Sequence, residues 1–127
     1  MAHPLLLKRA YDPAEAGDGF RVLVDRLWPR GISREALKLD LWAKELAPSN
    51  EVRKAFDHVP ERFEAFRSAY LAELSENPQA PDFVRQVARA LDQGAVTLVY
   101  AAKNEEFNQA VVLKAWLARK LSSEKKG

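Results

Sequence analysis

Two short stretches of the 127-residue sequence gather side chains that could do chemistry. The first is the string Asp25-Arg26-Leu27-Trp28-Pro29-Arg30-Gly31, and the second is Ala101-Ala102-Lys103-Asn104. A carboxylate in such a string can accept hydrogen bonds, hold an arginine or act as a general base. Guanidinium groups suit phosphate or carboxylate, and an indole offers a flat face for a ring or a cation. The residue types therefore predict a polar site for an anionic molecule.

Both stretches directly follow runs that are typical of β-strands. Residues 20–25 and 96–100 are rich in β-branched and aromatic side chains, and residues 5–7 form a third, shorter apolar run. The strands carry apolar residues on both faces, which favours a parallel sheet covered by helices on both sides. Ligands bind beyond the carboxyl ends of such strands. We therefore expect the tryptophan-bearing and lysine-bearing turns to share one rim.

Helical periodicity fills the rest of the chain. Ser33, Asp40 and Ser49 are expected to cap short helices, and longer apolar stripes follow in residues 60–77 and 83–94. Asn104 is expected to cap a long helix that extends to about Leu121. The sequence thus predicts an α/β fold with a small, mostly parallel sheet of about three or four strands flanked by helices. The segment between the second and third strands is rich in helix, and the C-terminal helix is long.

Length and composition narrow the class of protein. The chain has the size of one domain, so we expect residues 1–121 to form it and residues 122–127 to be a flexible basic tail. It has no cysteine and only two histidines, which excludes thiolate metal sites and multi-histidine metal sites. No cofactor is expected, because dinucleotide and P-loop glycine motifs are both missing. No apolar run is long enough to cross a membrane, and we expect a cytoplasmic protein.

Each candidate residue also has a purely structural interpretation. Asp25 could pair with Arg26 or Arg30 as a brace, Trp28 could fill the core, and Lys103 could simply be solvated. Acidic residues at positions 105 and 106 already oppose the dipole of a helix beginning nearby, which weakens the case for an anion there. A lone loop histidine such as His58 is more often a cap or surface group than a catalyst.

The strings Val24–Gly31, Asp40-Leu41-Trp42, Leu46-Ala47-Pro48-Ser49 and Val96–Lys103, with Asn108 and residues 110–113, resemble the YeaO-like proteins. These belong to the bacterial domain-of-unknown-function family 488. The resemblance covers roughly residues 5–118 and implies a small bacterial α/β protein, but it assigns no reaction, substrate or cofactor. By this resemblance, the marked positions are Asp25, Arg26, Trp28, Pro29, Arg30, Gly31, Trp42, Pro48, Ser49, His58, Tyr100, Lys103 and Asn108.

The sequence departs from the family pattern at two places. Phe107 stands where relatives often have a histidine before the asparagine at position 108, and His58 is followed by valine where relatives usually have aspartate. A histidine-dependent step near Asn108 is therefore not expected in this chain.

These observations lead to one functional hypothesis and one alternative. In the hypothesis, Arg26 and Arg30 hold an anionic, phosphate- or nucleotide-like small molecule, and Trp28 forms a wall of the pocket. Asp25 and Lys103 are the catalytic candidates should the site also be hydrolytic, and His58 and Asn108 complete the binding residues. The alternative is a non-enzymatic interaction module or a nucleic-acid-associated regulator. Nucleic acid is disfavoured because four basic residues fall within the last eleven positions instead of forming a stripe on one folded face.

Overall fold

The computed structural model describes residues 3–126, with only the backbone for residues 123–126. The elements, in chain order, are β1 (Leu5–Arg9), the 3₁₀ helix η1 (Ala16–Asp18), β2 (Phe20–Leu23), α1 (Arg34–Leu37), β3 (Leu41–Trp42), η2 (Lys44–Leu46), α2 (Asn50–Phe56), η3 (Pro60–Arg62), α3 (Phe63–Glu76), α4 (Ala80–Gln93), β4 (Val96–Tyr100) and α5 (Gln109–Lys126). The chain is an α/β fold, as its sequence predicts.

The four strands form one parallel sheet in the order β1-β4-β2-β3. β4 is the longest central strand and pairs with β1 through five residues and with β2 through four. Its five residues, Val96–Tyr100, are all buried, as the apolar residues on both faces of this run predict. Because all strands run in the same direction, the segments that follow β1, β2 and β4 emerge at one edge of the sheet.

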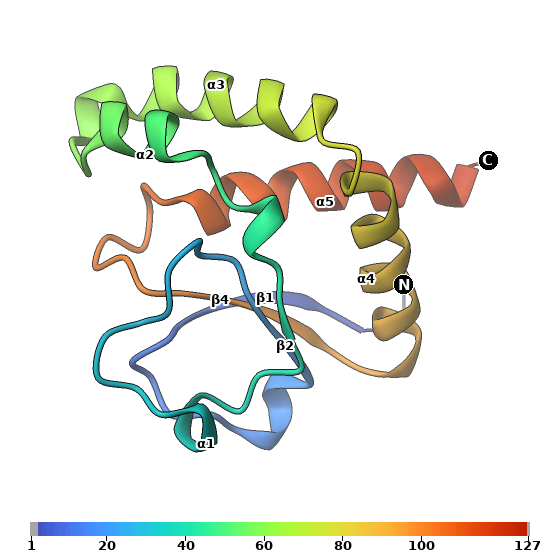
Figure 1. The fold of residues 1–127 in the computed structure, drawn as a ribbon. Coiled ribbons are helices and arrows are strands. Elements are labelled where there is room, and N and C mark those ends of the chain that lie inside the picture. Colours follow the sequence, from blue (N-terminus) through green and yellow to red (C-terminus); the bar gives the residue numbers. More distant parts are fainter. Residues whose placement is uncertain (1–2, 127) are drawn as a thin grey trace.

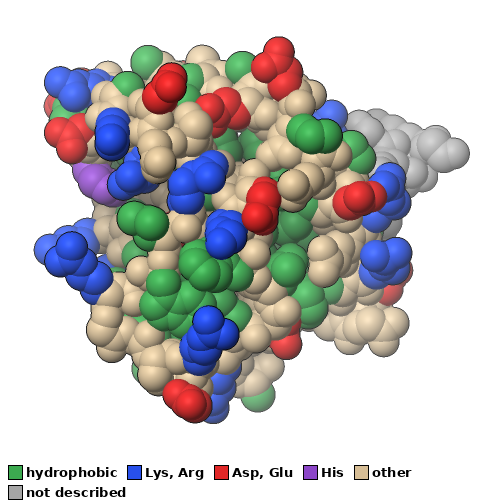
Figure 2. All heavy atoms as spheres, viewed as in Figure 1, with side chains coloured by type: hydrophobic (Ala, Val, Ile, Leu, Met, Phe, Trp, Pro, Cys, Tyr) green, Lys and Arg blue, Asp and Glu red, His purple; other side chains and the backbone are tan. Residues whose placement is uncertain are grey.

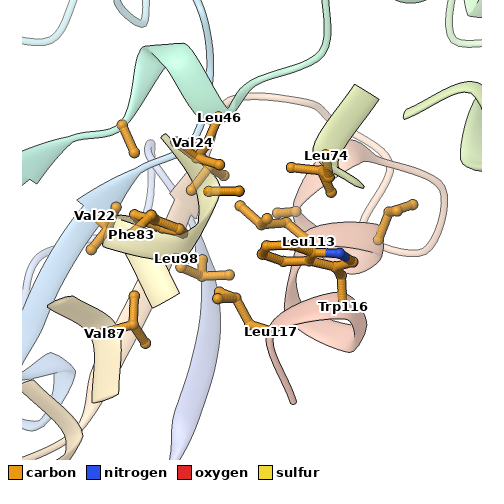
Figure 3. Close-up of a cluster of buried hydrophobic side chains, with 14 of the residues drawn as sticks. Val22, Val24, Leu46, Leu74, Phe83, Val87, Leu98, Leu113, Trp116 and Leu117 are labelled. Carbon is orange, nitrogen blue, oxygen red and sulfur yellow. The ribbon is translucent and has the colours of Figure 1, made fainter. Parts of the chain in front are cut away.

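One face of the sheet is covered by the long helices α3, α4 and α5 (Figure 1). Val22, Val24 and Leu98 point from the strands into this layer, where they belong to the same buried cluster as Phe83 of α4 and Leu113 of α5 (Figure 3). This is the main hydrophobic core. The opposite face holds a smaller buried cluster of Ala10, Leu23, Leu37 and Val99, beneath the short helix α1.

Gly19 sets the start of β2. Its φ of 65° lies in the left-handed region, and a Cβ at this position would overlap the carbonyl oxygen of Ala95. The neighbouring Phe20 N–H donates to that same oxygen at 2.8 Å. The close approach therefore aligns the starts of β2 and β4 and allows no side chain at position 19.

The prediction of a helix that begins at Asp40 is wrong. Leu41 and Trp42 form strand β3, which pairs with Val22 and Leu23, and the Asp40 carboxylate accepts a hydrogen bond from the Arg21 N–H at 2.9 Å. Pairing at the sheet edge satisfies the backbone of these residues, and only the three residues of η2 that follow are helical.

The C-terminal helix begins later than predicted. The side chain of Asn104 accepts from the N–H groups of Glu106 and Phe107, which closes a turn, and α5 begins only at Gln109. The Asn108 side chain caps this helix by accepting from the Val111 N–H at 3.0 Å. The caps predicted at Ser33 and Ser49 are confirmed, because their hydroxyl groups accept from Ala36 and Val52 N–H.

The expectations that the protein is cytoplasmic and needs no cofactor stay predictions. In the described part of the chain, no helix is both long and apolar enough to cross a bilayer. Among the side chains that the structure describes, residues 3–122, there is also no cluster of three acidic, histidine or cysteine groups that could hold a metal ion. The division into residues 1–121 and a flexible tail at 122–127 also stays a prediction, because that tail lies mostly where side chains are not described.

A buried charge cluster joins β1, η1 and β2 on the second face of the sheet. Asp18 accepts from Lys8 Nζ and from Arg21 Nη1, at 2.9 and 2.6 Å, and Arg21 Nε donates to the Leu37 carbonyl oxygen. The side chains of Asp18 and Arg21 are only 8% and 4% exposed. Such a pair is costly to break, because removal of one partner leaves a buried charge uncompensated.

Substitution Asp18→Ala is therefore expected to lower the free energy of unfolding by about 3–5 kcal/mol, measured by urea denaturation. Arg85→Ala is the control, because Arg85 forms an exposed pair with Asp82 and its loss should change stability by about 1 kcal/mol or less. Equal small effects of the two substitutions would contradict a structural role for the buried cluster.

Candidate functional site

A cavity of about 680 Å³ lies at the carboxyl edge of the sheet. It is lined by the loop after β2, the loop after β4 and the end of α2 with the turn that follows. Its lining residues are Tyr11, Asp25, Arg26, Leu27, Trp28, Pro29, Arg30, Pro48, Arg53, Phe56, His58, Phe66, Ala101, Ala102, Lys103, Asn104 and Gln109. The tryptophan-bearing and lysine-bearing turns thus meet at one rim.

Asp25 is held in a fixed orientation by two neighbours. Its Oδ2 accepts from the Ala101 N–H at 2.9 Å, and its Oδ1 accepts from the side-chain amide of Gln109. The indole N–H of Trp42 donates to the backbone oxygen of Asp25 at 2.7 Å. The carboxyl group therefore joins the end of β2 to the loop after β4 and to the start of α5. The structural alternative, in which Asp25 pairs with Arg26 or Arg30, is not what the structure shows, because Asp25 forms an ion pair with neither.

The environment of Asp25 changes its acidity. Burial raises the pKa of the Asp25 carboxyl to about 6, although the hydrogen bonds from Ala101 and Gln109 and the positive charge of Arg53 act in the opposite direction. A carboxyl group with a raised pKa in a cavity is a common feature of functional sites. At neutral pH this group is mostly ionised, so it is an acceptor of hydrogen bonds.

Arg26 braces the loop after β2. Its Nε donates to the Pro48 carbonyl oxygen at 3.1 Å and its Nη2 to the Ala47 carbonyl oxygen at 3.2 Å. The guanidinium group is half-buried and lines the cavity. Its planar fork therefore connects the motif to the segment before α2 while its charge stays at the cavity wall.

Trp28 stands between the cavity and the smaller core cluster. Its indole N–H donates to the Ile32 carbonyl oxygen at 2.7 Å, and its ring meets Trp42 edge to face with centroids 5.5 Å apart. These contacts hold the loop in shape, and Trp28 also lines the cavity. Gly31 follows with a φ of 76°, so its role is the left-handed turn, with no close neighbour at its Cα.

Arg30 and Lys103 lie on opposite loops at the rim of the cavity. Both side chains are exposed, and neither makes a hydrogen bond or ion pair with the described residues. The backbone oxygen of Arg30 accepts from the Tyr11 hydroxyl at 3.1 Å, which ties this loop to the segment after β1. Their charged ends are thus available to a bound anion.

His58 reaches the cavity from the turn after α2. Asp57 and His58 both have positive φ values, 48° and 56°, which non-glycine residues rarely adopt. The imidazole is exposed and lies 5.9 Å from the Phe56 ring, centroid to centroid. A strained turn of this kind is maintained by the surrounding structure and is often found at functional sites.

Asn108 is not brought to the cavity. It is buried, its Oδ1 caps α5, and its Nδ2 donates to the Asn104 carbonyl oxygen at 2.8 Å. The neighbouring Gln109, the first residue of α5, donates to Asp25 instead. The site residue that the resemblance suggests at position 108 therefore has a capping contact in this structure.

Three polar lining residues were not expected. Arg53 comes from α2, Gln109 from α5, and Tyr11 from the turn after β1. The rule that ligands bind beyond the carboxyl ends of parallel strands points only to the loops that follow the strands. Arg53 and Gln109 lie on helices, which reach the same edge from outside the sheet. The basic residues of this region gather at the left of the face in Figure 2, together with a histidine, where α2 approaches the loops beyond the sheet.

Comparison with known proteins places the chain in a family. A family model described as "Inactive DUF488-N3 subclade" matches residues 4–127. The chain belongs to the DUF488 family. The family assignment covers the whole cavity, from Tyr11 to Gln109, and agrees with the resemblance carried by the Val24–Gly31 string.

Two relatives illustrate the extent of the similarity. The DUF488 chain is 49% identical to the uncharacterized protein YeaO of Escherichia coli (strain K12) over 110 residues, which is 87% of this chain and 93% of YeaO. It is 37% identical to the uncharacterized protein Rv3073c of Mycobacterium tuberculosis (strain ATCC 25618 / H37Rv) over 105 residues, which is 83% and 86% of the two chains. No solved structure matches it significantly.

The raised pKa of Asp25 predicts a pH dependence of stability. The folded value of about 6 lies above the unfolded value of about 3.9, so this carboxyl stabilises the folded state fully below pH 4. That contribution is lost as the pH rises through 6. Relative to Asp25→Asn, the wild-type free energy of unfolding should therefore fall by up to about 3 kcal/mol between pH 4 and 7. A constant difference between the two proteins across this range would contradict the raised pKa.

The brace formed by Arg26 predicts that lysine cannot replace it. Arg26→Lys is expected to lower the free energy of unfolding by about 1–2 kcal/mol, because one ammonium cannot reproduce the two hydrogen bonds of the planar guanidinium group. Arg30→Lys is the matched control in the same loop and should have almost no effect. Identical melting temperatures for the two variants would show that the Pro48 and Ala47 contacts carry little stability.

Proposed function

We propose that this protein binds a small, phosphate-bearing anion in the cavity at the carboxyl edge of its sheet. The observation that carries the proposal is the charge of the lining: Arg26, Arg30, Arg53 and Lys103 line one cavity together with the single carboxylate of Asp25. These four basic residues come from three separate segments. Their convergence at a concave site favours a ligand that carries about two negative charges.

The size and walls of the cavity support a small molecule. A volume of about 680 Å³ falls in the range of small-molecule sites, which are mostly apolar with a few placed polar groups. Trp28, Phe56, Phe66 and two prolines supply the apolar walls. The smaller, shallower hollow at the opposite edge of the sheet, near Gly19 and Gln93, lacks such a group of cations.

A small ligand is favoured over nucleic acid. A nucleic acid binder makes many phosphate contacts along an extended basic surface. Here the basic residues of the site surround one cavity, so a long polyanion would reach them only at a single point.

Binding without hydrolysis is the simpler form of the proposal. Among the described residues, Asp25 is the one carboxyl group that lines the cavity, and one hydrogen bond to each of its oxygens, from Ala101 and from Gln109, holds it in place. The matching subclade is described as inactive, which is consistent with a binding role. We therefore include Lys103 in the proposal as a binding residue and do not assign it a catalytic step.

The proposal predicts that the exposed rim cations determine affinity for phosphate compounds. Isothermal titration calorimetry should detect binding of ribose 5-phosphate or a nucleoside monophosphate by the wild-type protein. Arg30→Ala and Lys103→Ala should each weaken it about threefold to tenfold, because each removes one partly solvated charge-assisted contact.

Arg119→Ala is the matched control, because Arg119 is exposed on α5 and does not line the cavity. This variant should bind as the wild type does. The proposal fails if no phosphate compound binds with a millimolar or lower Kd, or if binding is equally strong in the Arg30 and Lys103 variants.

A further inference from the structure

The lining of the cavity is divided between a buried part and an exposed part. Pro29, Phe56 and Phe66 are buried although they line the cavity, so they lie at its inner end. The exposed lining residues at the mouth include the cations Arg30, Arg53 and Lys103, beside Tyr11, Leu27, His58 and Asn104. A ligand that fits this division has one apolar end and one anionic end.

The carboxylate of Asp25 determines which end of the ligand enters first. A phosphate beside this group would be repelled, whereas the mouth offers the positive charges that attract it. The anionic end therefore stays at the mouth. The end that reaches Asp25 must instead offer hydrogen-bond donors, because an ionised carboxylate only accepts.

Asp25 has free acceptor capacity and a fixed orientation. Each carboxylate oxygen has about two lone-pair sites, and the Ala101 N–H and the Gln109 amide occupy one on each oxygen. One acceptor site thus remains on Oδ1 and one on Oδ2. Two adjacent N–H groups on a flat ring match this pair of acceptors, since bidentate contacts to a carboxylate are both stronger and more selective than single ones.

The aromatic walls suit the same ring. Phe56 and Phe66 stack with centroids 4.6 Å apart, and Trp28 lines the cavity from the other loop. Flat apolar side chains of this kind favour contact with a planar heterocycle at the cavity wall. An aliphatic sugar phosphate would leave these walls without a partner.

Building on the proposed anion-binding function, we propose that the ligand is a phosphomonoester of a planar heterocycle with two adjacent N–H donors, as on the edge of guanine. The donors face Asp25 and the phosphate lies between Arg30, Arg53 and Lys103. Asp25 is then the residue that selects the ring, while the basic mouth supplies affinity for any phosphate.

Calorimetric titration of the intact protein with four phosphate compounds at pH 7.5 tests this selection. The compounds are guanosine, inosine and adenosine 5′-monophosphates and ribose 5-phosphate. Guanosine monophosphate should bind at least tenfold more tightly than adenosine monophosphate and ribose 5-phosphate. Inosine monophosphate, which lacks the 2-amino donor, should bind with intermediate affinity.

Asp25→Asn should change the affinities for guanosine monophosphate and ribose 5-phosphate in different directions. It removes an acceptor that the ring needs and a negative charge that repels phosphate. Affinity for guanosine monophosphate should therefore fall to that of adenosine monophosphate, while affinity for ribose 5-phosphate should stay equal or rise. Asp92→Asn is the matched control, because Asp92 is exposed on α4, and it should change neither affinity.

The wild-type protein gives a second measurement that needs no substitution. As Asp25 takes up a proton below pH 6, the ratio of the affinities for guanosine monophosphate and ribose 5-phosphate should fall towards one. The ratio cancels the protonation of the phosphate itself, which both compounds share.

The outcomes separate this inference from the function on which it rests. Equal affinities for all four compounds, with dependence on Arg30 and Lys103, would overturn the ring selectivity and keep the anion site. A preference for adenosine monophosphate would also overturn it. Failure of all four compounds to bind would overturn the anion site itself.

Discussion

The carboxylate of Asp25 is the contact on which the geometry of the cavity depends. It accepts from the Ala101 N–H after β4 and from Gln109 at the start of α5, and its own backbone oxygen accepts from Trp42 on β3. One residue thus connects the end of β2 with β3, with the loop after β4 and with the start of α5. The loops after β2 and β4 can hold opposite walls of the cavity because this group fixes the space between them.

The carboxylates of Asp18 and Asp25 have opposite electrostatic roles. Burial alone would raise the pKa of Asp18, but hydrogen bonds from Lys8, the Glu15 N–H and Arg21 hold it below its usual value. Asp18 therefore stabilises the fold as an ion. Asp25 has no cation in direct contact among the described residues, and its pKa is raised, so its ionised form costs stability at neutral pH. A fold that keeps such a carboxylate beside a cavity has the arrangement expected of a site.

The sequence predicts the fold wherever local pattern and tertiary pairing agree. The runs at 5–7, 20–25 and 96–100 are β-branched or apolar and become the three main strands, and the stripes at 60–77 and 83–94 become α3 and α4. The observed structure differs from the prediction at Asp40–Leu46 and at the start of α5. The secondary structure of these segments depends on contacts with residues elsewhere in the chain. Leu41 and Trp42 pair with β2, and two asparagines, at positions 104 and 108, compete as caps. The rule that ligands bind beyond the carboxyl ends of parallel strands likewise finds Asp25, Arg30 and Lys103, but it misses Arg53 and Gln109, which reach the edge from helices that no local pattern connects to it.

The residues of the Asp25–Gly31 string divide between building the loop and facing the ligand. Arg26 donates to backbone oxygens before α2, Trp28 donates to Ile32, and Gly31 provides a left-handed turn. Within this string, only Arg30 has a charged group that is exposed and makes no hydrogen bond or ion pair with the described residues. Two arginines four positions apart therefore have different roles that their shared chemistry does not distinguish, because the difference is set by the carbonyl oxygens of Ala47 and Pro48. A motif of this kind marks where a site lies, while the hydrogen-bond partners of each side chain decide what that side chain contributes.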